Sequence, residues 1–95
     1  MNTLIQSSAF AGWLRGLADD FAKAHILRRI SSAELGNFGD RGPVGEGVCE
    51  MRVHPGPGYR VYFIRPGGAI YMLLCGGNKA SQNEISNAQM RWRVN

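Results

Sequence analysis

Hydrophobic residues in the first third of the chain recur at intervals of three and four, the spacing of one face of an α-helix. In the first stretch they are Phe10, Trp13, Leu14 and Leu17. In the second they are Phe21, Ala22, Ile26, Leu27 and Ile30. A serine, Ser7 or Ser8, can cap the first helix, and the Gly and Asn residues of LGNFGD mark the end of the second. The pattern predicts two adjacent helices, an αα-hairpin.

Three strand-like runs, rich in β-branched and aromatic residues, follow in the second half of the chain. They span 48–54, 59–65 and 69–75, and the turn sequences PGPG and PGG separate them. This spacing predicts two hairpins and therefore an antiparallel sheet. We expect the Gly-rich segment 36–47, which precedes the runs, to be a loop.

Together these elements predict an α+β fold in one domain that covers residues 1–95. In it, an N-terminal helical hairpin packs on a small antiparallel β-sheet. A short C-terminal helix over 82–92, capped by Ser81, completes the domain.

Alternation along the first two strands predicts how they pair. The core sets are Cys49, Met51 and Val53 on one strand and Val61 and Phe63 on the other. Directly opposed residues share a face, so the pairing must bring these two sets together. A three-residue loop over 55–57, with Gly58 at positive φ, achieves this. The same register sets Arg52 opposite Arg60.

Two opposed arginines repel each other, so this pair by itself contributes nothing to folding. An anion between the two guanidiniums would turn the repulsion into a two-armed clamp. We therefore expect a phosphate site at Arg52 and Arg60, on the open face of the sheet. The alternative is that Glu50, which lies diagonally near, neutralises one arginine and leaves a solvated face.

The charge balance favours an acidic partner, either a nucleic acid or an acidic protein. Eleven Lys and Arg residues against seven Asp and Glu give a net charge of +4, and nine of the eleven are arginine. Arginine suits bidentate contacts to phosphate and carboxylate better than lysine does.

Other classes of function are disfavoured. No signal-peptide pattern opens the chain and no window approaches the roughly 18 apolar residues of a membrane span, so we expect a cytoplasmic protein without a membrane partner. Cys49 and Cys75 lie in hydrophobic runs without His or Cys at metal-ligand spacing, which predicts reduced, buried thiols and no metal. The sequence GGNKAS lacks the spacing of a P-loop, which argues against nucleoside triphosphate binding.

Two further residues are candidates for the site. His54 is expected at the start of the hairpin loop on the arginine face, where an imidazole can transfer a proton. The alternative is an ordinary exposed histidine. Lys79 follows CGG after the third strand and can project from the same end of the sheet.

The chain resembles the RelE/ParE superfamily of toxins from type II toxin–antitoxin modules, in particular the branch of addiction-module killer proteins also called HigB-like. The resemblance covers nearly the whole chain. It rests on FAGWLRGLADDFAKAHILRRI, LGNFGDRGPVGEGVCEMRVHPGPGYRVYF and LLCGGNKASQNEISNA, in the order and spacing of the family.

The resemblance implies a toxin that cleaves messenger RNA, usually at the ribosome, without a metal or other cofactor, and that a cognate antitoxin, often a helix-turn-helix protein, holds inactive. By the family motif, Arg60 contacts the scissile phosphate, and Arg52 and Lys79 supply further basic groups. Tyr62, on the arginine face, is expected to stack an RNA base or to share in the proton transfer. Some members carry a tyrosine near the C-terminus where this chain has Ile85, so the general acid and base stay open between Glu50 and His54.

Two other functions remain as alternatives at this point. One is a ParE-like inhibitor that binds DNA gyrase and cleaves nothing. The other is a protein-binding module whose basic face only binds the antitoxin.

Overall fold

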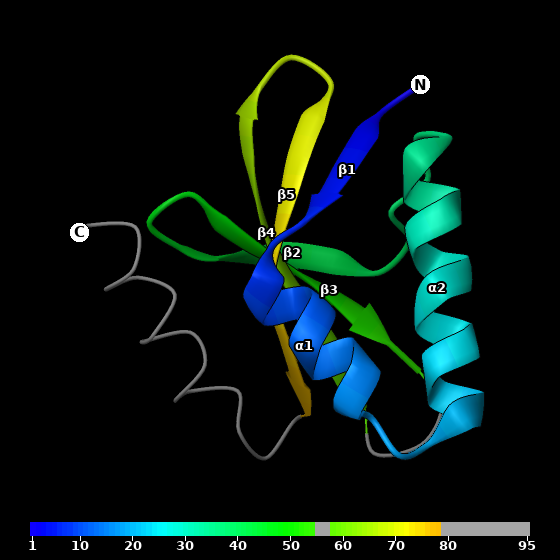
Figure 1. Ribbon diagram of the computed structural model, residues 1–95. Helices are drawn as coiled ribbons and strands as arrows, with labels where there is room; N and C mark the ends of the chain where they lie inside the picture. The colour runs from blue at the N-terminus through cyan, green and yellow to red at the C-terminus, as the bar shows by residue number, and fades with distance from the viewer. Residues whose placement is uncertain (55–57, 79–95) are drawn as a thin grey trace.

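The computed structural model describes residues 1–54 and 58–78. Within them the chain forms five strands and two helices, shown in Figure 1. In chain order the elements are β1 (Thr3–Gln6), α1 (Ser8–Gly16), α2 (Asp20–Glu34), β2 (Arg41–Gly45), β3 (Val48–Val53), β4 (Tyr59–Gly67) and β5 (Ile70–Asn78).

The strands form one mixed sheet in the order β1-β5-β4-β3-β2. β1 runs parallel to β5, whereas the other neighbours are antiparallel. The predicted fold, a helical hairpin on a small antiparallel sheet, is therefore wrong. The three predicted strands exist, but the chain adds a strand at each edge of the sheet, before the helices and directly after them.

The helices also do not form the expected hairpin unit. α1 packs on β5, and α2 packs on β1 and β3. In Figure 1, α2 stands to the right of the strands, and α1 lies in front of their lower part. Each helix thus buries its hydrophobic face against strands. The predicted C-terminal helix over 82–92 lies outside the described residues.

β1 is a strand because of its partner. Its residues are mostly exposed and show no clear alternation of buried and exposed positions. The strand instead pairs with β5, from Thr3 opposite Ile70 to Gln6 opposite Leu73. A bond from the Asn2 backbone N–H to Glu34 O, 2.7 Å long, ties its start to the end of α2. Pairing across such a distance in the chain leaves no local sequence signal.

β2 occupies part of the segment that the sequence predicted as a loop. Its sequence, RGPVG, is unusual for a strand, but it forms the edge of the sheet, where proline is tolerated. Pro43 pairs with Cys49, and a bulge follows before Gly45 pairs with Val48. An edge strand next to β3 therefore replaces the expected loop.

Side-chain hydroxyl and carboxylate groups cap both helices. Ser7, one of the two predicted caps, accepts a hydrogen bond from the Phe10 N–H at 3.0 Å. Asp19 accepts one from the Ala22 N–H at 3.1 Å at the start of α2. These caps satisfy N–H groups that lack partners within the helices.

The main core lies between the helices and the sheet. It contains Phe10, Leu14, Ile26, Ile30, Ala33, Phe38, Met51, Val53, Val61, Phe63, Tyr71 and Leu73. The predicted core sets of β3 and β4 both face it, although Cys49 is only partly buried. On α2 the buried residues are Ala22, Ile26, Ile30 and Ala33. Phe21 and Leu27 were expected in the core but are exposed. They lie on other sides of the helix than the four buried residues.

A bulge in β5 shifts its register against β4. Tyr62 pairs with Cys75 but Phe63 pairs with Leu73, so Leu74 is the extra residue. Leu74 joins Val48 and Tyr62 in a second hydrophobic cluster, separate from the main core. The face opposite the helices is therefore buried in part.

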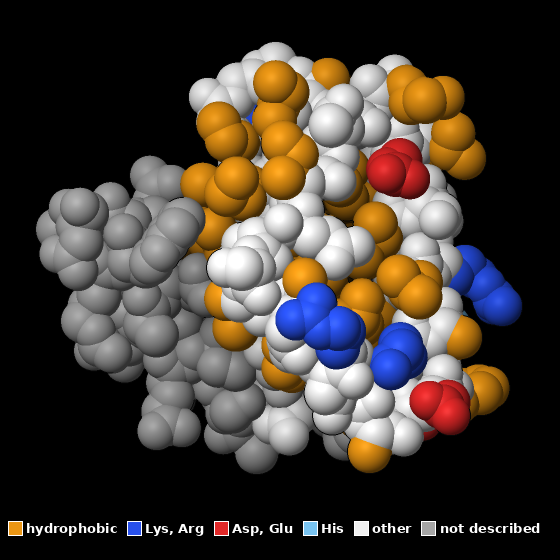
Figure 2. Space-filling model, in the orientation of Figure 1, with side chains coloured by type: hydrophobic (Ala, Val, Ile, Leu, Met, Phe, Trp, Pro, Cys, Tyr) orange, Lys and Arg blue, Asp and Glu red, His pale blue; other side chains and the backbone are white. Residues whose placement is uncertain are grey.

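Neither helix of the described residues has the length and apolar character that a membrane crossing requires. Figure 2 shows hydrophobic side chains at several places on the surface of the face seen in Figure 1, with Lys and Arg side chains between them.

Candidate functional site

The β3–β4 hairpin places Arg52 directly opposite Arg60, as the sequence predicted. Gly58 has the expected positive φ of 77°, and residues 55–57 of the predicted loop lie outside the described part of the chain. Met51 and Val61, which also pair, face the helices. Alternation therefore directs both arginines to the opposite face.

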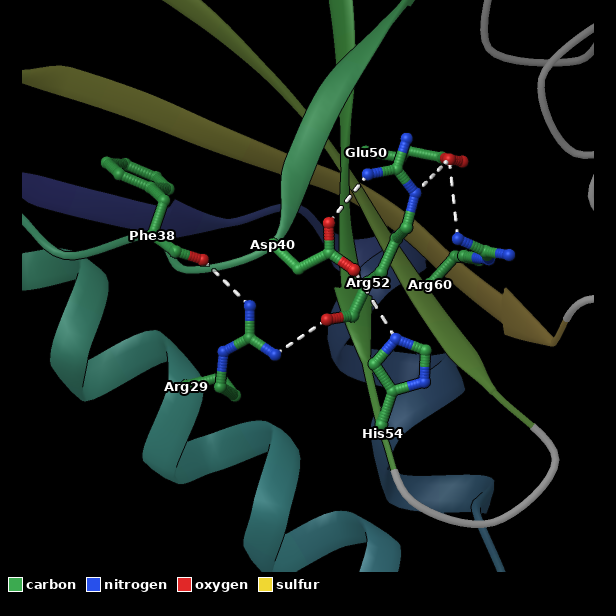
Figure 3. Close-up of polar contacts among 7 residues, drawn as sticks. All are labelled: Arg29, Phe38, Asp40, Glu50, Arg52, His54 and Arg60. Carbon is green, nitrogen blue, oxygen red and sulfur yellow. Dashed lines mark hydrogen bonds and ion pairs between the residues drawn. The ribbon is translucent and has the colours of Figure 1, made fainter.

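A single carboxylate joins the two guanidiniums. Glu50 Oε1 lies 3.1 Å from Arg52 Nε and 3.4 Å from Arg60 Nη1, as Figure 3 shows. The Glu50 side chain is only 3% exposed. Its negative charge offsets the repulsion between the arginines. This agrees with the alternative in which Glu50 neutralises one arginine, except that Glu50 contacts both.

The arginines are less accessible than expected. Arg60 is 11% exposed and Arg52 is 32% exposed. The face that carries them is therefore less open than expected, and the second hydrophobic cluster occupies another part of the same face. Tyr62, predicted to stack an RNA base from this face, is fully buried in that cluster with Val48 and Leu74.

Asp40, which the sequence did not single out, completes the cluster from just before β2. Its Oδ1 pairs with Arg52 Nη1 at 2.8 Å, and its Oδ2 lies 3.4 Å from His54 Nε2. The neighbouring Gly42 makes room for this contact, since a Cβ there would lie 2.9 Å from Arg52 Nη2. A predicted loop contained Asp40, and only the pairing of β2 with β3 brings it to Arg52.

The pairing changes the protonation of both partners. The hydrogen bond from Arg52 lowers the pKa of Asp40 below its usual value of 3.8. The same bond raises the pKa of Arg52, so the guanidinium stays charged. Asp40 is therefore a carboxylate at neutral pH and can orient the imidazole of His54, which is 65% exposed.

Arg29 supports the cluster from α2 without joining its ion pairs. Its Nη1 donates to Arg52 O at 2.6 Å and its Nη2 donates to Phe38 O at 2.8 Å (Figure 3). Gly39, at φ 67°, leaves space for this guanidinium. Helix α2 thereby holds the end of β3 and the segment before β2 in place. Nothing in the local sequence of α2 distinguishes Arg29 from the neighbouring charged residues Lys23 and Arg28.

These residues provide the groups that anion binding and proton transfer need. Arg52 and Arg60 are balanced in charge by Glu50 and Asp40, but each guanidinium has five N–H donors. Arg60 Nε is buried and no acceptor for it is found among the described residues. The imidazole of His54 is exposed and lies beside the arginines, where it can serve as a proton-transfer group. The cluster can thus donate hydrogen bonds to an oxyanion beside a proton-transfer group.

The structure brings four of the predicted residues together: Glu50, Arg52, His54 and Arg60. Lys79 lies outside the described residues. Within residues 1–54 and 58–78, no group of His, Cys, Asp and Glu side chains is arranged to hold a metal ion. Neither Cys49 nor Cys75 forms a disulfide within the described residues, and both are half-buried.

Comparison with known proteins found a relative that matches most of the chain. No family model matches the chain. An uncharacterized protein of Haemophilus influenzae is 44% identical to it over 82 residues, which cover 85% of this chain and 83% of the relative.

Proposed function

This chain belongs to the same protein family as the Haemophilus influenzae protein, and we propose that it is the toxin of a type II toxin–antitoxin module that cleaves messenger RNA. The cross-strand pair of Arg52 and Arg60, with the Asp40–His54 pair beside it, carries this proposal. A cognate antitoxin is then the partner that holds it inactive, and the cytoplasm, where messenger RNA is translated, is its site of action.

The proposed reaction uses the 2′-hydroxyl of the RNA as nucleophile. A base takes the proton from this hydroxyl, the 2′-oxygen forms a bond to the adjacent phosphorus, and the bond from phosphorus to the 5′-oxygen breaks. An acid protonates the leaving 5′-oxygen. The products are a 2′,3′-cyclic phosphate and a 5′-hydroxyl end, and DNA is not a substrate because it lacks the 2′-hydroxyl.

The arginines are proposed to stabilise the transition state. The phosphate gains negative charge as the 2′-oxygen attacks, and guanidiniums already fixed in place bind this charge without reorganisation. Glu50 supports this role, since its bonds to Arg52 Nε and Arg60 Nη1 hold both groups in position. In the proposal Glu50 is a positioning residue, because it is almost completely buried beneath the arginines.

His54 is proposed to transfer the proton. It is the most exposed member of the cluster, and its Nε2 lies 3.4 Å from Asp40 Oδ2. A carboxylate at this distance can orient the imidazole ring. Removal of a single proton-transfer group typically slows such a reaction by about 10²- to 10⁴-fold.

The direct test is induced expression with primer extension on a reporter messenger, comparing the wild type with Arg60→Ala. Arg28→Ala, an exposed arginine on α2, is the matched control. We expect growth arrest and new 5′ ends for the wild type and the control, and neither for Arg60→Ala. Circular dichroism on the purified proteins must show that Arg60→Ala is folded.

The same test separates the alternatives. New ends that follow the codon phase indicate cleavage at the ribosome. Growth arrest without new ends, together with relaxed plasmid in a gyrase assay, would overturn the nuclease proposal in favour of a gyrase inhibitor. Absence of both effects would leave a protein that only binds its antitoxin.

A further inference from the structure

A second arginine pair lies on the helix face of the sheet, away from the candidate site. Arg41 pairs with Met51, a core residue, and therefore shares its face. Arg65 alternates with Phe63, which belongs to the same core. Between these arginines lies a pocket of about 460 Å³. The sheet separates this pocket from the Arg52–Arg60 pair.

Aromatic rings and other apolar groups form much of the pocket wall. Phe63, Tyr71, Cys49 and Pro43 line it. The ring of Phe38 packs against both aromatic rings, with its centroid 5.3 Å from that of Phe63 and 4.8 Å from that of Tyr71. Small-ligand pockets typically have about 300–1,000 Å³ and mostly apolar linings with a few placed polar groups. The volume of this pocket lies within that range, and its lining combines these apolar groups with the two arginines.

The guanidiniums at the rim are held by aromatic rings. Arg41 Cζ lies 4.7 Å from the Phe38 centroid and Arg65 Cζ lies 5.5 Å from that of Tyr71. Arg65 Nε also donates to Gly68 O at 2.6 Å. Stacking uses the face of a guanidinium and leaves N–H groups at its edge available for an anion. The rim therefore presents two preoriented donor groups.

No carboxylate neutralises this pair within the part of the chain that the structure describes. The ion pairs found there all involve Arg52, Arg60 or His54. Both Arg41 and Arg65 are exposed. The two arginine pairs differ in this respect, because Glu50 and Asp40 accompany the first. Two unneutralised cations above an apolar wall favour a ligand that has both a negative charge and an apolar body.

We propose that this pocket binds a small organic anion in which a phosphate or carboxylate group is attached to a flat aromatic body. The aromatic body packs against Phe63 and Tyr71, and the anionic group receives hydrogen bonds from Arg41 and Arg65. The proposal does not depend on RNA cleavage, and the site would act alongside that function. Nucleoside monophosphates and aromatic carboxylates share this chemistry.

The test is titration of the full chain with adenosine monophosphate, indole-3-acetate and inorganic phosphate, followed by calorimetry and by NMR of the aromatic side chains. We expect saturable binding of at least one aromatic anion, with shifts at the Phe63 and Tyr71 rings, and binding about tenfold weaker for inorganic phosphate. Tighter binding of adenosine monophosphate or of indole-3-acetate shows whether the natural ligand is a nucleotide or an aromatic carboxylate.

Charge-removing variants locate the binding. Arg41→Gln and Arg65→Gln should each weaken it by about tenfold, which is the usual effect of losing one charge-assisted hydrogen bond. Arg28→Gln, on α2, should bind as the wild type does, and circular dichroism checks that each variant is folded. The proposal is overturned if no aromatic anion binds saturably, if inorganic phosphate binds equally well, or if the double variant retains full affinity. RNA cleavage by Arg41→Gln is expected to be unchanged, so failure here is distinct from failure of the proposed function.

Discussion

Arg52 and Asp40 are joined twice, once through the backbone and once through their side chains. The Arg52 N–H donates to Asp40 O at 2.8 Å, and Arg52 Nη1 pairs with Asp40 Oδ1 at 2.8 Å. The backbone bond fixes the segment before β2 against β3, and the ion pair then orients the guanidinium. A residue twelve positions away in the chain thus determines where Arg52 points.

The first prediction concerns this pair and pH. The folded-state pKa of Asp40 lies below 3.8, because Arg52 donates a hydrogen bond to the carboxylate. A group whose pKa is lower in the folded state stabilises the protein above its unfolded pKa, and the contribution is lost as the pH falls through the folded value. Asp40→Asn should therefore reduce stability at pH 7, and its difference from the wild type should disappear as the pH falls below 3.8 and through the folded value. Urea unfolding at several pH values measures this.

A matched variant separates the ion pair from a general charge effect. Glu46→Gln removes a carboxylate from the exposed turn between β2 and β3. Its stability difference from the wild type should be small at every pH. NMR titration of Asp40 should give a midpoint below 3.8 in the wild type and a higher one in Arg52→Ala. Equal midpoints in the two proteins would contradict the interpretation.

The second prediction is that Glu50→Gln destabilises the protein by about 3 kcal/mol. Loss of one partner from a buried ion pair typically costs about 3–5 kcal/mol, and the lower value applies because Arg52 is partly exposed. The neutral amide cannot offset the repulsion between Arg52 and Arg60. Chemical denaturation measures the change, with Glu46→Gln as control, and a loss below about 0.5 kcal/mol would show that Glu50 does not hold the arginines.

The third prediction tests the contact between Trp13 and Gly76. A Cβ at position 76 would overlap atoms Cε3 and Cζ3 of the Trp13 ring, which packs on this part of β5. Gly76→Ala should therefore displace the ring and destabilise the protein by about 1–3 kcal/mol. A changed tryptophan emission spectrum should accompany the lower midpoint in urea.

Gly16→Ala is the control for this substitution. A Cβ at position 16, at the end of α1, would meet nothing within 4 Å. Alanine is preferred over glycine in a helix by roughly 0.5–1 kcal/mol, so this variant should be as stable as the wild type or slightly more. If both variants lose stability equally, the Trp13 contact is not the cause.

The fourth prediction concerns catalysis and depends on the proposed function. His54→Gln should reduce RNA cleavage by about 10²-fold or more while leaving stability nearly unchanged, since the side chain is mostly exposed. His25→Gln, on α2, removes the other histidine and should cleave normally. Rates of reporter cleavage beside urea midpoints check this, and full activity of His54→Gln would remove the imidazole from the mechanism.

Much of the candidate site could be predicted because it is local in the chain. Alternation of polar and hydrophobic residues sets which face each side chain of a strand occupies. The requirement that both core sets face the helices then determined the register of β3 and β4, and with it the pairing of Arg52 with Arg60. Gly58 at positive φ follows from the same hairpin geometry.

The fold as a whole could not be predicted in this way. β1 and β2 have little side-chain pattern of their own, and each is a strand because a neighbour provides backbone hydrogen bonds. The prediction of a helical hairpin was also wrong, because the hydrophobic faces of α1 and α2 pack against strands. Local patterns show that an element has a face to bury but do not show which element covers it.

The sequence by itself therefore determined the two helices, the three central strands and the arginine pair. Tertiary structure decided what surrounds that pair: the burial of Tyr62, the contact with Asp40 and the support from Arg29. The physical reason is the distance along the chain over which each kind of interaction acts. Helix and strand periodicity acts between residues a few positions apart, whereas an ion pair or a buried face depends on chain segments that meet only after folding.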